Sequence, residues 1–149
     1  MNSKSKENED VLFPNEKVIV TKYFDVHQDW SVPIPGFFII ASIRKIRSVA
    51  DFTDEETREF MKLMCVIRRG MKDKLGIKEV YLFQREDTEH ASFHLWIFPR
   101  YKWMEKFGSG IQSIRPIIEY SKENMKNDVT IHKVKKAVKQ MKEYMKNFK

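Results

Sequence analysis

Residues 92–100 show the clearest alternation of hydrophobic and polar positions in the chain. Phe93, Leu95 and Ile97 would share one face of a β-strand, because successive side chains of a strand point to opposite sides. The other face would carry a hydroxyl, an imidazole and two aromatic rings, from Ser92, His94, Trp96 and Phe98. Pro99 lacks an amide donor, so the strand should end there. The pattern predicts a strand with one face in the core and the other at a candidate site.

Four further segments have the short apolar or alternating runs of strands: residues 17–21, 23–30, 37–41 and 79–84. Residues 31–36 contain two prolines and a glycine, which indicate a turn. The short connection between the strand at 79–84 and the strand at 92–100 favours an antiparallel pair.

The clearest helix start lies at Thr53. Glu56 stands three residues later and can complete a capping box, and Gly76 is a natural stop. Between them an apolar stripe at helical spacing consists of Phe60, Met64, Ile67 and Met71, widened by Met61 and Leu75. The pattern predicts a long helix whose methionines and aromatic rings pack in the core.

The C-terminal part of the chain is predicted to be helical. Residues 101–110 should form a loop, and a helix should begin near Ile111 because Pro116 is tolerated only in a first turn. Residues 130–148 place apolar side chains at alternating spacings of three and four, with lysines between them. This seam favours a helix docked on its own domain. A contact in a homodimer and a nucleic-acid or membrane surface stay open as alternatives.

These strand and helix segments together indicate an α+β fold with a long helix and C-terminal helices. A chain of 149 residues is expected to form one domain. The expected division is a disordered tail at 1–12, the sheet domain at 13–110 and a helical extension at 111–149 packed on the same domain.

The net charge of +7 belongs mainly to one segment. Residues 120–149 carry nine lysines against three acidic residues and so contribute +6. The basic pI therefore does not favour a nucleic-acid partner. The lone Cys65 falls in a helical apolar pattern and predicts a buried thiol in a reducing compartment. No apolar run reaches the ~18 residues of a membrane span and the N-terminus has no signal-peptide core, so we expect a cytoplasmic protein without a membrane partner.

Among the four histidines, His94 has the most chemically suggestive neighbours. His132 lies in the lysine-rich helix and should face solvent, and a structural role is favoured for His27. His90 and His94 would lie ~13 Å apart on a strand, so no metal site is expected. On the residue pattern alone, His94 could be a structural histidine or a catalytic group.

The order of the elements and three motifs resemble the histidine-triad (HIT) superfamily of nucleotide hydrolases and transferases over residues 16–101. Residues 32–40, Val-Pro-Ile-Pro-Gly-Phe-Phe-Ile-Ile, are similar to the family's turn and following central strand. Residues 48–56, Ser-Val-Ala-Asp-Phe-Thr-Asp-Glu-Glu, are similar to its helix entry. Counted back from Pro99 and Arg100, His94 falls on the middle histidine of the His-x-His-x-His pattern.

The resemblance implies a mostly antiparallel five-stranded sheet packed with a long helix, plus C-terminal helices. It also implies that His94 attacks the α-phosphorus of a nucleotide derivative and that water hydrolyses the resulting nucleotidyl-histidine. An imidazole with its ordinary pKa of ~6.5 is largely neutral and nucleophilic at pH 7. The implied substrate is a dinucleoside polyphosphate or a nucleoside phosphoramidate. By resemblance, Asp29 would bind the ribose hydroxyls, with turn capping as its alternative role, and Gln84 would contact phosphate. Mg²⁺ would accompany a polyphosphate substrate, and no cofactor bound by protein ligands is expected.

The chain departs from the family pattern at the first and third triad positions, which are Ser92 and Trp96. A serine can donate a hydrogen bond to phosphate, whereas the indole N–H can donate a hydrogen bond but cannot deliver a proton to a leaving group. Trp96 and Phe98 offer faces on which a base could stack, and Glu89 would repel a polyphosphate if it faced the site.

Three functions follow from these features. The leading hypothesis is a HIT-like nucleotidyl hydrolase or transferase, and its alternative is a catalytically weak or inactive HIT-fold protein that binds a nucleotide. The third is an interaction protein that binds polyanions through the basic C-terminal helix.

Overall fold

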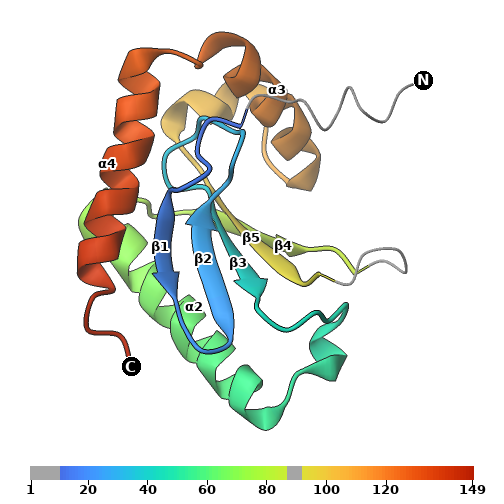
Figure 1. The fold of residues 1–149 in the computed structure, drawn as a ribbon. Helices are drawn as coiled ribbons and strands as arrows, with labels where there is room; N and C mark the ends of the chain where they lie inside the picture. Colours follow the sequence, from blue (N-terminus) through green and yellow to red (C-terminus); the bar gives the residue numbers. More distant parts are fainter. Residues whose placement is uncertain (1–10, 87–91) are drawn as a thin grey trace.

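Five antiparallel strands form a single sheet in the order β1-β2-β3-β5-β4 in the computed structural model, which describes residues 11–86 and 92–149 (Figure 1). The strands are β1 (Lys17–Val20), β2 (Phe24–Gln28), β3 (Phe38–Ser42), β4 (Val80–Gln84) and β5 (His94–Pro99). The predicted sheet and the antiparallel pairing of its last two strands are confirmed, and β5 ends at Pro99 as expected.

One face of the sheet packs against the long helix α2 (Asp54–Leu75). Leu63, Ile67 and Met71 recur every four residues and are fully buried, because this spacing keeps them on one side of a helix. They meet the alternate strand residues that point the same way, which include Val26, Phe38, Ile40, Leu95 and Ile97. This layer is the main hydrophobic core.

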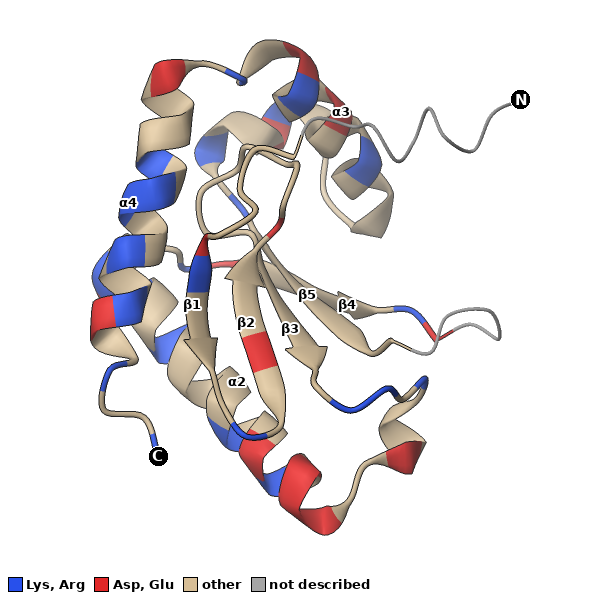
Figure 2. Ribbon diagram, in the orientation of Figure 1, with Lys and Arg blue, Asp and Glu red and all other residues tan. Residues whose placement is uncertain are grey.

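The C-terminal helix α4 (Asp128–Tyr144) runs beside α2 and β1 (Figure 1). Val138, Met141 and Met145 of the predicted seam belong to the main core, and Val134 is buried as well. Lysine positions recur along the ribbon of α4 (Figure 2), and the lysines of this helix are exposed. The seam therefore packs on the chain's own sheet domain, and the C-terminal excess of positive charge lies on the surface of α4.

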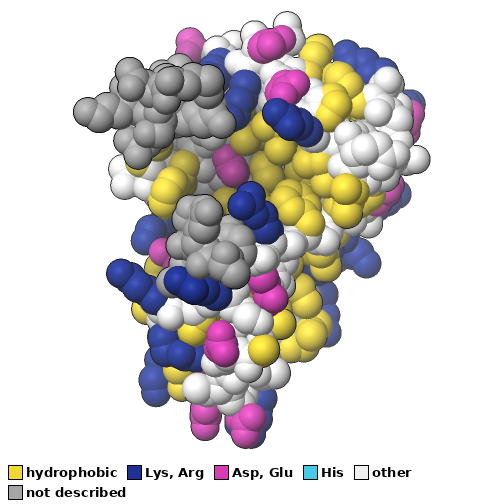
Figure 3. All heavy atoms as spheres, turned by 90° about the vertical axis from the view of Figure 1, so that its right-hand side faces the viewer, with side chains coloured by type: hydrophobic (Ala, Val, Ile, Leu, Met, Phe, Trp, Pro, Cys, Tyr) yellow, Lys and Arg dark blue, Asp and Glu magenta, His cyan; other side chains and the backbone are white. Residues whose placement is uncertain are grey.

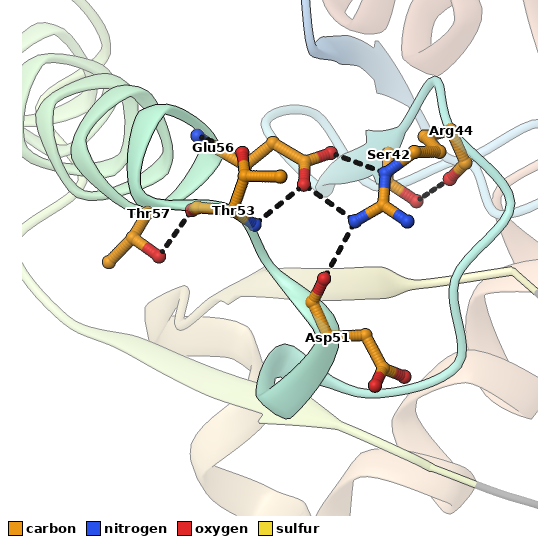
Figure 4. Close-up of polar contacts among 6 residues, drawn as sticks. All are labelled: Ser42, Arg44, Asp51, Thr53, Glu56 and Thr57. Carbon is orange, nitrogen blue, oxygen red and sulfur yellow. Dashed lines mark hydrogen bonds and ion pairs between the residues drawn. The ribbon is translucent and has the colours of Figure 1, made fainter.

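The connection from β3 to α2 is held by the predicted capping box (Figure 4). Thr53 Oγ1 accepts from the Glu56 amide at 3.1 Å, and the Glu56 carboxylate accepts from the Thr53 amide at 2.9 Å. Arg44 donates to the same carboxylate at 2.7 Å and to the Asp51 carbonyl at 2.6 Å. The hydrogen bond from Arg44 lowers the pKa of Glu56, so this buried carboxylate stays charged and fixes the start of the helix.

The other face of the sheet is covered over only part of its length. Here lie the 3-10 helices η2 (Lys102–Phe107) and η3 (Ile111–Ser113) and the helix α3 (Ile114–Asn124). Their buried side chains Met104, Ile114 and Ile117 pack on Phe37 and Phe98, near the end of β5. The beginning of β5, which carries His94, lies beyond this second core.

Several expectations about individual segments are wrong. Residues 101–110 contain the 3-10 helix η2 rather than only a loop. Tyr101 precedes this helix, and the Gly108 amide donates its closing hydrogen bond to the Glu105 carbonyl. Cys65 is exposed rather than buried, and Met61 is 52% exposed, because the buried stripe of α2 runs through Leu63 instead.

The expected tail at 1–12 lies mostly outside the described residues. Of its last two residues, Leu12 donates its amide hydrogen bond to the Trp30 carbonyl at 2.8 Å. No helix in the part of the chain that the structure describes is long and apolar enough to cross a bilayer.

Candidate functional site

The strand register brings polar side chains together on the partly covered face of the sheet. Asp25 pairs with Ala41, and Ala41 pairs with His94, so these three residues form a row across β2, β3 and β5. Paired residues of an antiparallel sheet point to the same side. The small, partly buried Ala41 thus lies between a carboxylate and an imidazole on this face.

The hydrogen-bond partner of His94 determines which of its nitrogens can react. Nδ1 of this half-buried histidine lies 3.2 Å from the Ser92 carbonyl oxygen and 3.4 Å from the Ser92 hydroxyl. When Nδ1 carries the ring proton, it donates to the Ser92 carbonyl and the lone pair lies on Nε2. The site thus offers an imidazole oriented by Ser92, which can act as a nucleophile or a base in its neutral form.

Aromatic rings border His94 on one side. The Trp96 ring lies 5.6 Å from the imidazole and stacks at 8° on Phe83 of β4, with 5.4 Å between ring centroids. Trp96 is only partly buried, so a ring edge can contact a ligand. Phe98, expected to offer a second stacking face, is fully buried against Phe37 at 5.1 Å. That expectation is wrong, because the second core covers the end of β5.

His27 is a residue of this face that the sequence reasoning did not place at the site. It follows Asp25 at the strand period and lies in the neighbouring row, opposite Ile39 and so in line with Trp96. Its Nδ1 lies 3.4 Å from Asp25 Oδ1, and its ring stacks on Trp30 with 5.3 Å between centroids. Alternation of Asp25 and His27 with the buried Phe24 and Val26 was the available signal.

Burial lowers the pKa of His27 below its ordinary value of 6.5, although the neighbouring Asp25 carboxylate opposes that shift. The positive form of His94 would lower the pKa of His27 further, so the two imidazoles interact electrostatically. His27 is therefore neutral at pH 7. Asp25 keeps its charge partner in Lys17, whose Nζ lies 2.8 Å from Oδ2.

Asp29 stands at the end of β2, and the structure shows it capping the turn. Its Oδ1 accepts from the amides of Ser31 and Val32, both at 3.0 Å. Tyr101 fixes the same turn by donating to the Pro35 carbonyl at 2.5 Å. Both amide bonds use one carboxylate oxygen, so the turn-capping role does not occupy Oδ2.

The register does not bring Gln84 to His94. Gln84 pairs with Leu95, whose side chain lies in the main core on the opposite side of the sheet. The Gln84 side chain instead hydrogen-bonds to Glu86, whose carboxylate also accepts from the Val49 amide. Ser92 is exposed beside His94. Glu89 and His90 lie outside the described residues.

Metal ligands do not gather on either face as far as residues 11–86 and 92–149 are concerned, since no three His, Cys, Asp or Glu side chains lie close enough together to hold an ion. The chemistry visible on this face is that of an imidazole, a hydroxyl, carboxylates and aromatic rings.

Comparisons with known proteins find similar solved structures but no similar sequences. No family model matches the chain, and no curated protein matches its sequence. A Plasmodium falciparum diadenosine triphosphate hydrolase, solved with cyclomarin A, superposes with a TM-score of 0.58 at 15% identity, covering 91% of this chain and 79% of that one.

Two bacterial structures are similar as well. A zinc-bound histidine-triad family protein from Mycobacterium smegmatis matches with a TM-score of 0.56 at 12% identity, over 87% of this chain and 88% of that one. A HIT-like protein from Bartonella henselae, described as involved in cell-cycle regulation, matches with a TM-score of 0.53 at 18% identity, over 91% and 93%. At identities this low, the superpositions show a shared fold alone. The chain therefore has the fold of the histidine-triad proteins, as its motifs predicted.

Proposed function

We propose that this protein is a nucleotidyl hydrolase or transferase that cleaves a dinucleoside polyphosphate, with His94 as the nucleophile. The observation that carries the proposal is the contact of His94 Nδ1 with the Ser92 carbonyl, which orients the half-buried ring and leaves Nε2 outside that contact. The likeness to a diadenosine triphosphate hydrolase supports the substrate class through the shared fold.

The reaction would proceed in two displacements. In the first, Nε2 of His94 forms a bond to the α-phosphorus while the bond from phosphorus to the bridging oxygen breaks, and the electron pair leaves on the released nucleotide. In the second, water adds to the phosphorus, the P–N bond breaks, and its electron pair returns to Nε2. The proton of the attacking water leaves to solvent, so His94 is regenerated neutral.

Trp96 bears on the choice of substrate. Because an indole N–H does not ionise near neutral pH, the third triad position cannot protonate a leaving group. A phosphate leaving group departs as an anion without a proton, and Mg²⁺ accompanying the polyphosphate would offset its charge. The amine of a phosphoramidate needs a proton in order to leave. This difference favours a dinucleoside polyphosphate over a nucleoside phosphoramidate.

The remaining roles belong to residues around His94. The Ser92 hydroxyl and the Trp96 indole would donate hydrogen bonds to phosphate oxygens. Asp29 would accept from the ribose hydroxyls through Oδ2 while Oδ1 holds the turn. Gln84 is not part of this arrangement, because its strand position directs it to the other side of the sheet.

Covalent trapping tests the proposal directly. After the reaction with a diadenosine polyphosphate is quenched in alkaline denaturant, which preserves the acid-labile P–N bond, mass spectrometry should find a nucleotidyl adduct on the peptide that contains His94. His94→Asn should lose the adduct and more than about a thousandfold in kcat/KM. His132→Asn, an exposed histidine of α4, is the matched control and should retain both. Equal rates for wild type and His94→Asn would refute catalysis by this residue.

A second candidate is a protein that holds a nucleotide without cleaving it. Trp96 favours this reading, because a ring already stacked on Phe83 is suited to packing rather than to proton transfer. Calorimetry with AMP, ADP and GMP would then show binding to wild type and to His94→Asn alike, with no adduct and no turnover. Absence of heat with all three ligands would contradict both functions.

A further inference from the structure

An apolar groove of about 530 Å³ lies between β4 and the segment that precedes and forms α3. Its apolar lining comes from Phe83 of β4 and from Ile111, Ile114 and Ile118. This volume falls within the range of sites that hold small organic ligands. Figure 3 shows hydrophobic side chains in a hollow of this side of the molecule, with basic and acidic side chains at its edge.

The groove adjoins the candidate site through the ring of Phe83. Phe83 lines it and also stacks on Trp96, and Trp96 in turn contacts the imidazole of His94. Two ring-to-ring steps of 5.4 and 5.6 Å therefore lead from the groove to the proposed nucleophile. A polyphosphate bridge with its ribose can span this separation.

The charges at the rim suit a bridge of phosphates. Arg115 and Lys122 border the groove together with one acidic residue, Glu119. Arg115 contacts Glu119 at 3.3 Å across one turn of α3, but its side chain is 90% exposed and can turn toward a ligand. The rim therefore carries an excess of positive charge over an apolar floor.

Ile111 shows that the groove is not filled by the chain itself. Its side chain is 71% exposed, the highest value among the large hydrophobic side chains of the described residues. Isoleucine and phenylalanine side chains can pack on the flat face of an aromatic ring, and they offer no hydrogen bonds to its edge. The lining is thus suited to a planar ring and does not distinguish one base from another.

We propose that this groove binds the second nucleoside of the substrate, the one that departs with the leaving phosphates. The inference rests on the proposed function, because it assigns the first nucleoside to the face that carries His94. Arg115 and Lys122 would contact the bridging phosphates, and the isoleucines would cover the second base without selecting its identity.

The test compares two ligands with the same number of phosphates. ATP and a methylene-bridged diadenosine triphosphate differ in the second nucleoside, and neither binding measurement requires turnover. Calorimetry on wild type should give a Kd for the dinucleotide about tenfold below that for ATP. Replacing adenine in the second nucleoside by guanine or uracil should change the Kd by less than about threefold.

Variants test whether the higher affinity for the dinucleotide comes from the groove. Ile111→Asn should remove most of the tenfold difference and leave the Kd for ATP unchanged, and adding Ile118→Asn should remove the rest. Val129→Asn is the matched control, because Val129 of α4 is 66% exposed and does not line the groove. If the double variant does not fold, the single Ile111→Asn decides the question, since its exposed side chain contributes little to the core.

The outcomes separate this inference from the proposed function. Equal affinities for ATP and the dinucleotide in wild type would overturn the groove assignment alone. A tenfold gain that survives Ile111→Asn would also overturn it. A nucleotide-independent dimer that Ile111→Asn dissociates would assign the groove to a second copy of the chain. No binding of either ligand would overturn both proposals.

Discussion

The two faces of the sheet differ in what covers them, although the same five strands build both. On one face α2 and α4 pack along the strands, and the inward residues are almost all apolar. On the other face η2, η3 and α3 cover the end of β5, and the beginning of β5 carries a histidine near a carboxylate and a second histidine. Because side chains alternate, β5 contributes Leu95 and Ile97 to one face and His94 and Trp96 to the other. The comparison shows that adjacent residues of one strand can serve different purposes, one packing in the core and the next facing the candidate site.

The largest expected effect on stability comes from the fully covered face. Ile97 is completely buried and pairs with Phe38 and Leu82. Ile97→Ala should lower the free energy of unfolding by about 2–5 kcal/mol, because it leaves a cavity in the main core. Chemical denaturation measures this loss. Nucleotide affinity of the folded fraction should stay unchanged, and a parallel loss of affinity would show that the two faces are not independent.

A smaller effect is expected from filling the space beside His94. Ala41 lies between Asp25 and His94 and is only partly buried. Ala41→Leu should weaken AMP binding by about tenfold, or ~1.4 kcal/mol, with little change in the melting temperature. Ala50→Leu, at an exposed position of η1 (Val49–Asp51), serves as control. Unaltered affinity in Ala41→Leu would mean that the ligand does not occupy this part of the sheet.

The smallest expected effect is a change in the pH dependence of stability. The pKa of His27 is lower in the folded protein than its ordinary value of 6.5, so the unfolded chain binds the proton more readily. The contribution of His27 to stability is therefore fully present above pH 6.5 and is lost as the pH falls below that value. Denaturation at a series of pH values should show a shallower acid loss for His27→Gln than for wild type.

The exposed His132 supplies the comparison for this measurement. His132→Gln should retain the acid loss of stability that wild type shows. If His27→Gln and wild type lost stability with the same slope as the pH falls, the pKa of His27 would not be lowered in the folded protein.

Local patterns were sufficient to predict most of the fold. The alternation in β5, the capping box at Thr53 and Glu56, and the position of Pro116 in the first turn of α3 each depend on neighbouring residues, and the structure contains all three. The resemblance placed His94 on the middle triad position, and the fold comparison agrees with the family it named. His94 as a nucleophile stays a prediction.

Features that depend on distant residues were harder to predict. Phe98 points to the same face of β5 as His94 and Trp96. It is nevertheless buried, because residues 101–124 fold back over the end of this strand. The resemblance assigned Gln84 to a phosphate contact, but its pairing with Leu95 places its side chain on the opposite side of the sheet from His94. His27 was underrated for the same reason, since only the register of β2, β3 and β5 brings it near His94.

The position of Cys65 has a practical consequence. It is the single cysteine of the chain and is exposed on α2, in the layer on the far side of the sheet from His94. A thiol-reactive fluorophore would therefore attach at one defined place without engineered cysteines, and it would leave the face that carries His94 clear for ligand titrations. The same accessible thiol can link two chains under oxidising conditions, so the native protein should be handled with a reductant.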